Sequence, residues 1–108
     1  MLTDKSAMKK VFTNLVRNAK EATDRFPATM EIEINCNQEE CQVVFRDFGR
    51  GISLVHQEKI FSKGFSTKPD GEGIGLWLAK QMVQKHGGEL KLLRSNGQVT
   101  EFILTLPL

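Results

Sequence analysis

Residues 31–51 read EIEINCNQEECQVVFRDFGRG, and this stretch predicts two β-strands, the loop between them and a closing turn. Apolar and polar residues alternate over Glu31–Cys36 and again over Cys41–Asp47, which is the period of a half-buried β-strand. The polar residues 37–40 between these segments predict a hairpin loop. A glycine turn, Gly49–Gly51, follows the second segment and ends it.

The flanking sequence predicts helices. Residues 6–24 place apolar side chains at the 3.6-residue period of one helix face. Residues 74–86 do the same and are followed by Gly87-Gly88, which is typical of a helix C-terminus. Ser53 is placed to cap a short helix through about residue 60.

Two more strands are predicted, Glu89–Leu93 and Thr100–Leu106, with a turn at 95–97 between them. The order of elements is then helix, hairpin, short helix, loop, helix, hairpin. This order predicts the α+β class: a two-layer α/β sandwich whose mostly antiparallel, mixed sheet carries about three helices on one face. Residues 1–108 are long enough for a single domain with a core of its own.

Composition excludes several classes of function. The 15 Lys+Arg and 13 Asp+Glu leave a net charge of +2, too little to predict nucleic-acid binding. No apolar run approaches the roughly 18 residues that suggest direct membrane insertion. The first ten residues carry charges and no apolar signal-peptide core, so a cytoplasmic domain is expected.

The chain has two cysteines, Cys36 and Cys41, on either side of the predicted hairpin loop. They form no C-x-x-C pair and no zinc-binding pattern. They could face each other across the loop, but a disulfide is unusual in a reducing compartment. Two half-buried free thiols are therefore predicted.

A first candidate site lies on the polar edge of the first helix. Asn14, Asn18 and Glu21 are spaced i, i+4 and i+7, which places them in a stripe about 60° wide. Amide and carboxylate oxygens grouped in this way suit a hard cation such as magnesium, which also takes phosphate oxygens as ligands. The alternative is an ordinary solvated helix face.

A second candidate is the turn that begins with Asp47. A carboxylate only accepts hydrogen bonds, so Asp47 would bind the exocyclic amine of adenine and repel the carbonyl oxygen of guanine. Gly49 and Gly51 would let a ligand approach the backbone closely. The alternative is an ordinary Asp-x-Gly turn.

A third candidate is the glycine-rich segment 66–76, in which Ser66-Thr67-Lys68 precede glycines at every second position. Backbone N–H groups at the start of the following helix would favour phosphate. The spacing fits neither a Walker A loop nor the dinucleotide fingerprint G-x-G-x-x-G. A flexible linker is the alternative.

Taken in order, these motifs resemble those of the catalytic, ATP-binding domain of sensor histidine kinases, within the GHKL (Bergerat-fold) ATPase superfamily. Residues 14–19 are similar to the N box, 47–51 to the G1 box, 60–65 to the F box and 71–76 to the G2 box. Residues 97–107 resemble the last strands of that domain. The resemblance therefore covers nearly the whole chain.

The resemblance implies that ATP and Mg²⁺ are the cofactors. It makes Asn18 the principal magnesium ligand, with Asn14 supporting metal and phosphates. Asp47 would bind the adenine amine, and Thr100 would lie near that contact. The nucleotide-binding set implied in this way is Asn14, Asn18, Glu21, Asp47, Gly49, Gly51, Ile52, Phe65, Ser66, Thr67, Lys68, Gly71, Gly73, Ile74, Gly75, Leu76 and Thr100.

Asn14 separates branches of the superfamily. Members that hydrolyse ATP, and the related serine kinases, place a general-base Glu at this position, whereas an amide cannot take up a proton. Asn14 therefore favours the histidine kinases, whose acceptor imidazole is itself nucleophilic. A serine kinase of the anti-sigma-factor type stays an alternative. So does a non-catalytic nucleotide-sensing module, because Glu21 stands where many members have a basic residue.

The implied partners are a helical dimerisation domain that carries the acceptor histidine, in the same or a partner kinase, and a downstream response regulator. No acceptor motif, a His followed by Glu and Pro, occurs in the chain. His56 and His86 are predicted to be surface or capping residues. The resemblance also implies a monomer that binds nucleotide but shows little turnover alone.

Overall fold

The computed structural model describes residues 5–21, 30–65 and 75–107. Its elements are α1 (Lys5–Glu21), β1 (Met30–Cys36), β2 (Glu40–Asp47), α2 (Leu54–Gln57), α3 (Gly75–Lys85), β3 (Glu89–Ser95) and β4 (Thr100–Pro107). Every element lies where the sequence predicted it, within a few residues at the ends. The first and last helices and both hairpins are confirmed.

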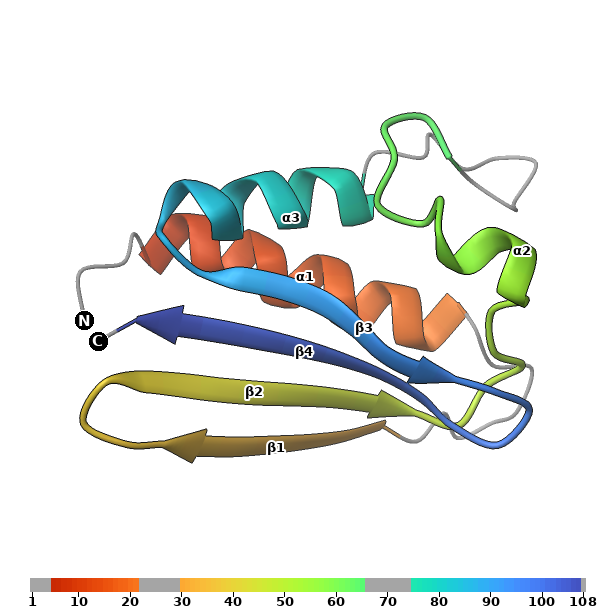
Figure 1. Ribbon diagram of the computed structural model, residues 1–108, viewed down its shortest axis with the longest axis horizontal. Coiled ribbons are helices and arrows are strands. Elements are labelled where there is room, and N and C mark those ends of the chain that lie inside the picture. Colours follow the sequence, from red (N-terminus) through yellow and green to blue (C-terminus); the bar gives the residue numbers. More distant parts are fainter. Residues whose placement is uncertain (1–4, 22–29, 66–74, 108) are drawn as a thin grey trace.

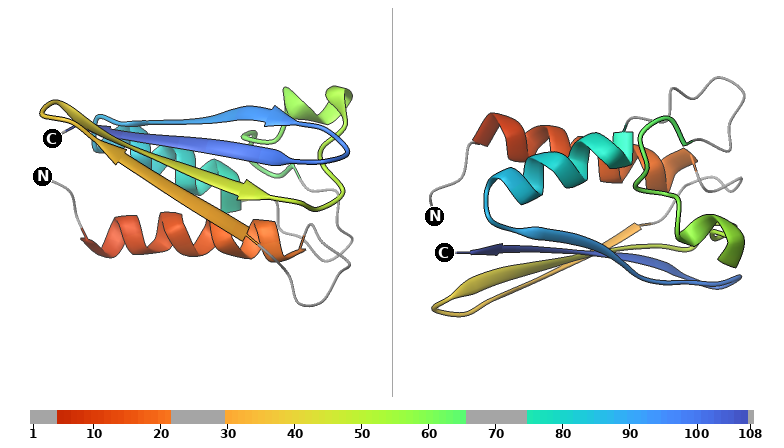
Figure 2. Two further views of the ribbon diagram at one scale, coloured as in Figure 1. Left: turned by 90° about the horizontal axis from the view of Figure 1, so that it is seen from below. Right: turned by 45° about the horizontal axis from the view of Figure 1, so that its top comes forward.

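Four antiparallel strands form one sheet in the order β1-β2-β4-β3. Helices α1 and α3 lie side by side on one face of this sheet, and α2 sits at one end (Figures 1 and 2). This is the predicted two-layer α+β sandwich, and all of its described strand pairings are antiparallel.

The core lies between the sheet and the two long helices. Its fully buried members come from five elements and are Val11, Leu15, Val43, Phe45, Ala79, Val83, Leu90, Phe102 and Leu104, with Ile60 and Leu106 beside them. Phe12 of α1 stands edge-on to Phe45 of β2, with ring centroids 5.2 Å apart. The periodic apolar positions of the sequence are thus the residues that hold α1 on the sheet.

The outer face of the sheet is held by charge. Arg46 of β2 donates a hydrogen bond to Glu101 of β4 at 2.5 Å and another to Glu31 of β1 at 3.3 Å. Arg94 of β3 also donates to Glu101. The hydrogen bond from Arg46 is the main cause of the lowered pKa of Glu101, against an opposing effect of burial. One row of alternating charges therefore crosses all four strands.

Strand β1 forms an edge of the sheet. Ile32 and Ile34 share a face with the core residues Phe45 and Val43, their register partners. Yet they are 47% and 62% exposed, because no described helix covers this strand. An exposed edge of this kind is a place where another strand or chain can pair.

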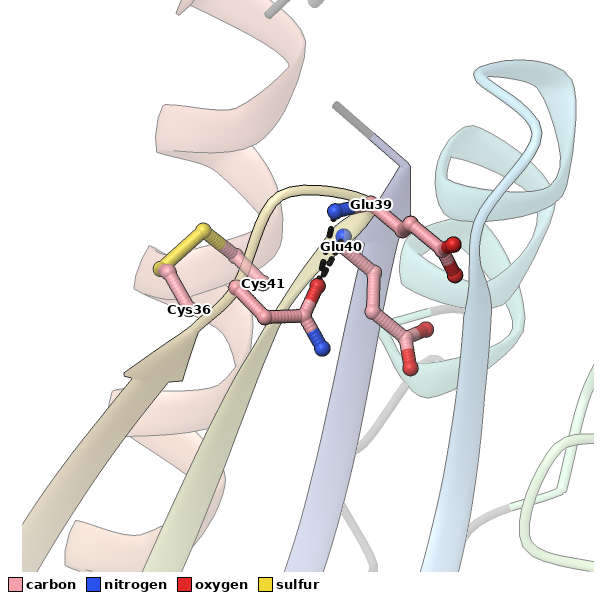
Figure 3. The surroundings of a disulfide bond; sticks show 5 residues. Cys36, Glu39, Glu40 and Cys41 are labelled. Atoms are coloured by element: carbon pink, nitrogen blue, oxygen red, sulfur yellow. Dashed lines mark hydrogen bonds between the residues drawn. A yellow bond between two sulfur atoms is a disulfide. The ribbon is translucent and has the colours of Figure 1, made fainter.

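One prediction about local structure is wrong, and a second, that Ser53 caps α2, holds for the position of Ser53 but not for its side chain. Cys36 and Cys41 are not free thiols: they form a disulfide across the β1–β2 hairpin (Figure 3). They are register partners, so the pairing of the strands brings their side chains together on one face. Ser53 precedes α2, but its side chain makes no capping hydrogen bond; its backbone carbonyl accepts from the N–H groups of His56 and Gln57 instead.

The end of α3 follows the sequence closely. Gly87 adopts φ +79°, its N–H donates to the carbonyl of Gln84, and the N–H of Gly88 donates to that of Val83. This is the Schellman arrangement that the glycine pair predicted. His86 forms a hydrogen bond between Nδ1 and the carbonyl of Met82 at 2.7 Å, which places its ring in the helix terminus.

Candidate functional site

The predicted site residues of the described chain lie at one end of the sandwich. The second half of α1, the end of β2, the start of α3 and the start of β4 meet there, with α2 beside them (Figure 1). The β1–β2 loop lies at the opposite end of the sheet. The topology therefore brings together three motifs that are far apart in the sequence.

Asp47 is the last residue of β2 and is only 4% exposed. It is the register partner of Thr100, the first residue of β4, which is 3% exposed. The carboxylate accepts a hydrogen bond from the N–H of Gly49 at 3.0 Å. Burial raises the pKa of Asp47, and the Gly49 hydrogen bond lowers it by a smaller amount.

A buried carboxylate is usually paired with a cation or held by several hydrogen bonds. No ion pair to Asp47 occurs within residues 5–21, 30–65 and 75–107, in contrast to Glu101 in the adjacent register pair, which is bonded to two arginines. A buried carboxylate without a cation retains acceptor capacity for an incoming N–H donor. This geometry suits a ligand that offers an amine or amide hydrogen.

Gly51 shapes the loop after β2. Its φ of +81° favours glycine, and a Cβ atom there would lie 2.4 Å from the carbonyl oxygen of Asn96. The loop after β2 therefore packs directly against the β3–β4 turn, backbone to backbone. No other residue type fits without displacing one of the two segments.

Side chains that the sequence did not single out hold this contact. Ser95 Oγ accepts a hydrogen bond from the N–H of Ile52 at 2.8 Å and lies 2.6 Å from Thr100 Oγ1. Gln57 Nε2 donates to the carbonyls of Ile52 and Ser95 at 2.8 and 3.3 Å. Both residues position the loop beside Asp47. The turn motif at 95–97 was the one sequence signal that pointed to Ser95.

The two asparagines of α1 differ in their surroundings. Asn14 Nδ2 donates a hydrogen bond to the carbonyl of Gly75, the first residue of α3, at 3.3 Å. This leaves the Asn14 Oδ1 atom as an acceptor between the two helices. Asn18 is half-buried, and its side chain makes no hydrogen bond with another residue of the described ranges.

The amide oxygens of Asn14 and Asn18 supply only part of a magnesium site. No group of three His, Cys, Asp or Glu side chains that could hold a metal occurs in the part of the chain that the structure describes. Two amide oxygens one helical turn apart are hard ligands, but they fill only part of an octahedral shell. They fit a magnesium ion that takes its other ligands from water and from the phosphates of a nucleotide.

A cavity of about 420 Å³ lies against α1 and includes Asn14. Its lining is Ser6, Lys9, Lys10, Thr13, Asn14, Arg17 and Leu78. Among these described residues three are cationic and none is acidic, a lining that attracts anions. The sequence motifs included only Asn14 of this set, although the spacing of 6, 9, 10, 13, 14 and 17 along a helix predicts a common face.

The remaining predicted residues fall into two groups. Ile52, Phe65 and Leu76 are half-buried and pack against the core. Phe65 also faces the ring of His56, with centroids 5.4 Å apart. The other predicted residues lie outside the described part of the chain: Ser66, Thr67, Lys68, Gly71, Gly73 and Ile74, together with the side chain of Glu21.

No helix within the described ranges is long and apolar enough to cross a membrane.

Comparison with known proteins gives a consistent result. A family model described as "Histidine kinase-, DNA gyrase B-, and HSP90-like ATPase" matches residues 3–108. The sensor protein TdiS of Thauera aromatica is 31% identical over 109 residues, which cover 96% of this chain and 20% of TdiS. The sensor protein SrrB of Staphylococcus aureus is 31% identical over 112 residues, covering 96% of this chain and 19% of SrrB.

Among solved structures, the catalytic domain of the histidine kinase ThkA superimposes with a TM-score of 0.84 at 31% identity. The match covers 97% of this chain and 68% of that domain. The chain therefore spans about a fifth of the length of the curated relatives it matches. The matched region includes all of the elements that form the site.

Proposed function

The chain belongs to the family of histidine kinase-, DNA gyrase B- and HSP90-like ATPases, and from this we propose that it is the ATP-binding catalytic domain of a sensor histidine kinase. In this proposal it binds Mg-ATP and transfers the γ-phosphoryl group to a histidine on a separate helical domain. The phosphoryl group then passes to an aspartate of a response regulator. ATP is present in the cytoplasm, so the domain would act there.

The observation that carries the proposal is the buried Asp47. It has a raised pKa, a single described hydrogen bond from the Gly49 N–H, and no ion pair in the described ranges. The exocyclic amine of adenine would satisfy this carboxylate, whereas the carbonyl oxygen of guanine would repel it. Thr100, its register partner, would complete the contact with a hydroxyl group.

Asn18 and Asn14 would hold the metal and phosphates at the other side of the site. Magnesium would neutralise charge on the phosphates. Asn14 is bonded to Gly75 at the start of α3, so it would also fix the helix that follows the glycine-rich segment. The adjoining cavity is lined by Lys9, Lys10 and Arg17. These side chains would add positive potential where the domain with the acceptor histidine would approach.

An amide at position 14 offers no general base. The proposed transfer does not need one, because a neutral imidazole nitrogen attacks phosphorus directly and ADP leaves with the electrons of the broken P–O bond. The chain's work is then to position the two reactants and to neutralise charge. This favours histidine over serine as acceptor, since a serine hydroxyl must lose a proton as it attacks.

Isothermal titration calorimetry of the chain with a non-hydrolysable ATP analogue, with and without Mg²⁺, tests the binding step. We expect magnesium-dependent binding of the adenine nucleotide and much weaker binding of the corresponding guanine analogue. Equal binding of the two would contradict the role of Asp47. No binding of either would contradict the whole proposal.

Phosphate transfer needs a second experiment. The chain is incubated with γ-labelled ATP and a helical domain that carries the acceptor histidine, and the labelled product is exposed to acid. Phosphohistidine is lost in acid and phosphoserine survives, so acid-labile label supports the proposal. Acid-stable label would identify a serine kinase, and absence of label despite nucleotide binding would favour a non-catalytic nucleotide sensor.

A further inference from the structure

The only two cysteines of the chain are joined to each other beside the β1–β2 loop, at the end of the sheet opposite the one where β2 finishes. Cys36 ends β1 and Cys41 is the second residue of β2, and they form the last register pair before the loop. Cys36 is exposed and Cys41 is half-buried. Small reagents can therefore reach the sulfur atoms from solvent, unlike those of a disulfide inside a core.

The hairpin is held closed by contacts that do not depend on the sulfur atoms. Asn37 Oδ1 accepts hydrogen bonds from the N–H groups of Glu39 and Glu40, both at 2.8 Å (Figure 3). The N–H of Asn37 also donates to the carbonyl of Glu40 at 2.9 Å. Six further register pairs continue from Asn35–Gln42 to Met30–Asp47.

This arrangement has a chemical consequence. When the disulfide is reduced, the Asn37 turn and the strand pairing keep the two thiols opposite each other. The second thiol then reacts at the high effective concentration of an intramolecular group. Oxidation and reduction can thus proceed back and forth without unfolding of the chain.

We propose that Cys36 and Cys41 form a reversible redox modification site, which low-molecular-weight disulfides oxidise and dithiols reduce. One cysteine thiolate attacks the small disulfide, so that a mixed disulfide forms and one small thiolate leaves. The second cysteine thiolate attacks the sulfur of the first, closes the Cys36–Cys41 bond and releases the other small thiolate. Both cysteine protons end on the two leaving thiolates, and the small disulfide takes up two electrons.

The modification would act on the edge strand β1. This strand pairs only with β2 within the described sheet, and its Ile32 and Ile34 side chains are exposed on the face that also carries Cys36. The bond ties the loop end of β1 to β2, and its reduction leaves that end held by hydrogen bonds alone. The redox state would therefore set how firmly this edge is held.

The inference rests on the proposed function in one respect: an ATP-dependent kinase domain works in a compartment where thiols are kept reduced, so the bond would form there only on oxidation. Nucleotide binding itself should not depend on it. Cys41 lies six residues along β2 from Asp47, and no described hydrogen bond links the loop to the site.

The test is equilibration of the whole chain in buffers with different ratios of reduced to oxidised glutathione. Samples are quenched with acid, alkylated and weighed by mass spectrometry. We expect one transition from the doubly alkylated chain to the bonded chain, reversed by dithiothreitol under native conditions. Thiols that stay alkylatable in fully oxidised glutathione would overturn the proposal, and so would a bond that resists excess dithiothreitol in the folded chain.

Amide hydrogen exchange tests the effect on the edge. In the reduced chain, we expect β1 amides near Cys36 to exchange about tenfold faster than in the oxidised chain, while those of Val43–Phe45 are unchanged. The Cys36→Ser/Cys41→Ser double variant, which has no thiol left to form a mixed disulfide, should match the reduced wild type in both redox buffers. Equal exchange of β1 in all samples would overturn the control of the edge.

Nucleotide titration of the same samples separates this inference from the proposed function. We expect the affinity for the ATP analogue to agree within about twofold between redox states, because six residues of strand separate the two regions. Absence of nucleotide binding in both states would contradict the kinase proposal. The mass spectrometry and hydrogen exchange results would still test the redox site.

Discussion

At the end of the sheet where β2 finishes, side chains from four separate elements meet, whereas at the opposite end the β1–β2 loop holds itself together. The first of these, called the nucleotide end because it is the proposed nucleotide site, depends on hydrogen bonds between residues 38 to 61 positions apart in the chain. The hairpin end depends on hydrogen bonds two or three positions apart and on a disulfide across five. Long-range contacts shape the former end and local contacts the latter.

The two ends also differ in what they contribute to stability. At the nucleotide end, a carboxylate is buried without a described cation, which costs free energy that a ligand can return. At the hairpin end, each contact closes a local turn and only stabilises the fold. Changes at the nucleotide end should therefore alter ligand binding first, and changes at the hairpin end should alter stability alone.

Gly51→Ala should have the largest effect, because it should lower both the stability of the chain and its affinity for nucleotide. A Cβ atom would lie 2.4 Å from the Asn96 carbonyl oxygen at a φ of +81°. We expect a loss of about 3 kcal/mol of unfolding free energy, about 1 from the backbone conformation and the rest from overlap. Binding of the ATP analogue should fall with it. Urea denaturation and calorimetry measure the two effects.

Gly64→Ala is the matched control for the Gly51 variant. Gly64 has a similar φ of +86°, but no atom of the described residues lies within 4 Å of its added Cβ atom. It should lose only about 1 kcal/mol and keep its nucleotide affinity. An equal loss in both variants would mean that the contact with Asn96 does not hold the loop.

Asp47→Asn should change ligand affinity and folding stability in opposite directions. Loss of a charged acceptor should weaken the ATP analogue by roughly 10- to 100-fold. At pH 7 the variant should nevertheless melt roughly 2–4 °C higher than the wild type, because it no longer buries a charge. Calorimetry gives the affinity, and thermal unfolding at several pH values gives the stability.

The sign of this pH effect follows from the pKa of Asp47, which burial raises above its ordinary 3.8. The wild type has its full stability from this group below 3.8 and loses it as the pH rises through the folded-state pKa. The advantage of Asp47→Asn should therefore vanish in acid. A variant that is less stable than the wild type at pH 7 would show that a described or bound partner already satisfies the carboxylate.

Glu101→Gln provides the opposite case on the same pair of strands. The hydrogen bond from Arg46 lowers the pKa of Glu101 below its ordinary 4.5, so its contribution is present above that pH and is lost as the pH falls. Glu101→Gln should thus lower the melting temperature at pH 7 and leave nucleotide binding unchanged. Asp47 has a raised pKa and Glu101 a lowered one. Thermal unfolding at several pH values would therefore show opposite pH dependences for the two variants.

Cys41→Ser should test the hairpin end. Without the bond, chain entropy predicts a loss of about 2 kcal/mol for a loop of this length, measured against the oxidised wild type in urea. Nucleotide affinity should stay the same. A weakened affinity with unchanged stability would reverse the comparison between the two ends.

The sequence was sufficient for features that depend on local pattern. The alternation of Glu31–Asp47 predicted the first hairpin, the periodicity of 6–24 predicted α1, and Gly87-Gly88 predicted the end of α3. In each case, the information lies within a few residues of the structure that it specifies. The order of these elements then predicted the two-layer sandwich.

Features that depend on tertiary contact were missed or misjudged. Cys36 and Cys41 were predicted to be free thiols because a disulfide is unusual in a reducing compartment, whereas the strand register places them directly opposite each other. The hydrogen bond from Asn14 to Gly75 crosses from α1 to α3, and no spacing along the chain reveals it. The nucleotide-binding roles of the site residues stay predictions until ligand binding is measured.

Ser95→Ala should have the smallest effect and tests a residue that the motifs did not include. Its hydroxyl accepts from the N–H of Ile52 and contacts Thr100 Oγ1, so the variant leaves a half-buried N–H without its partner. We expect the ATP analogue to bind roughly 3- to 10-fold more weakly, since the loop beside Asp47 is held less firmly. Ser53→Ala is the matched control, because Ser53 is exposed and its side chain makes no capping hydrogen bond. If both variants bind like the wild type, Gly51 and Gln57 suffice to hold the loop, and the nucleotide end depends less on long-range side-chain contacts than its geometry suggests.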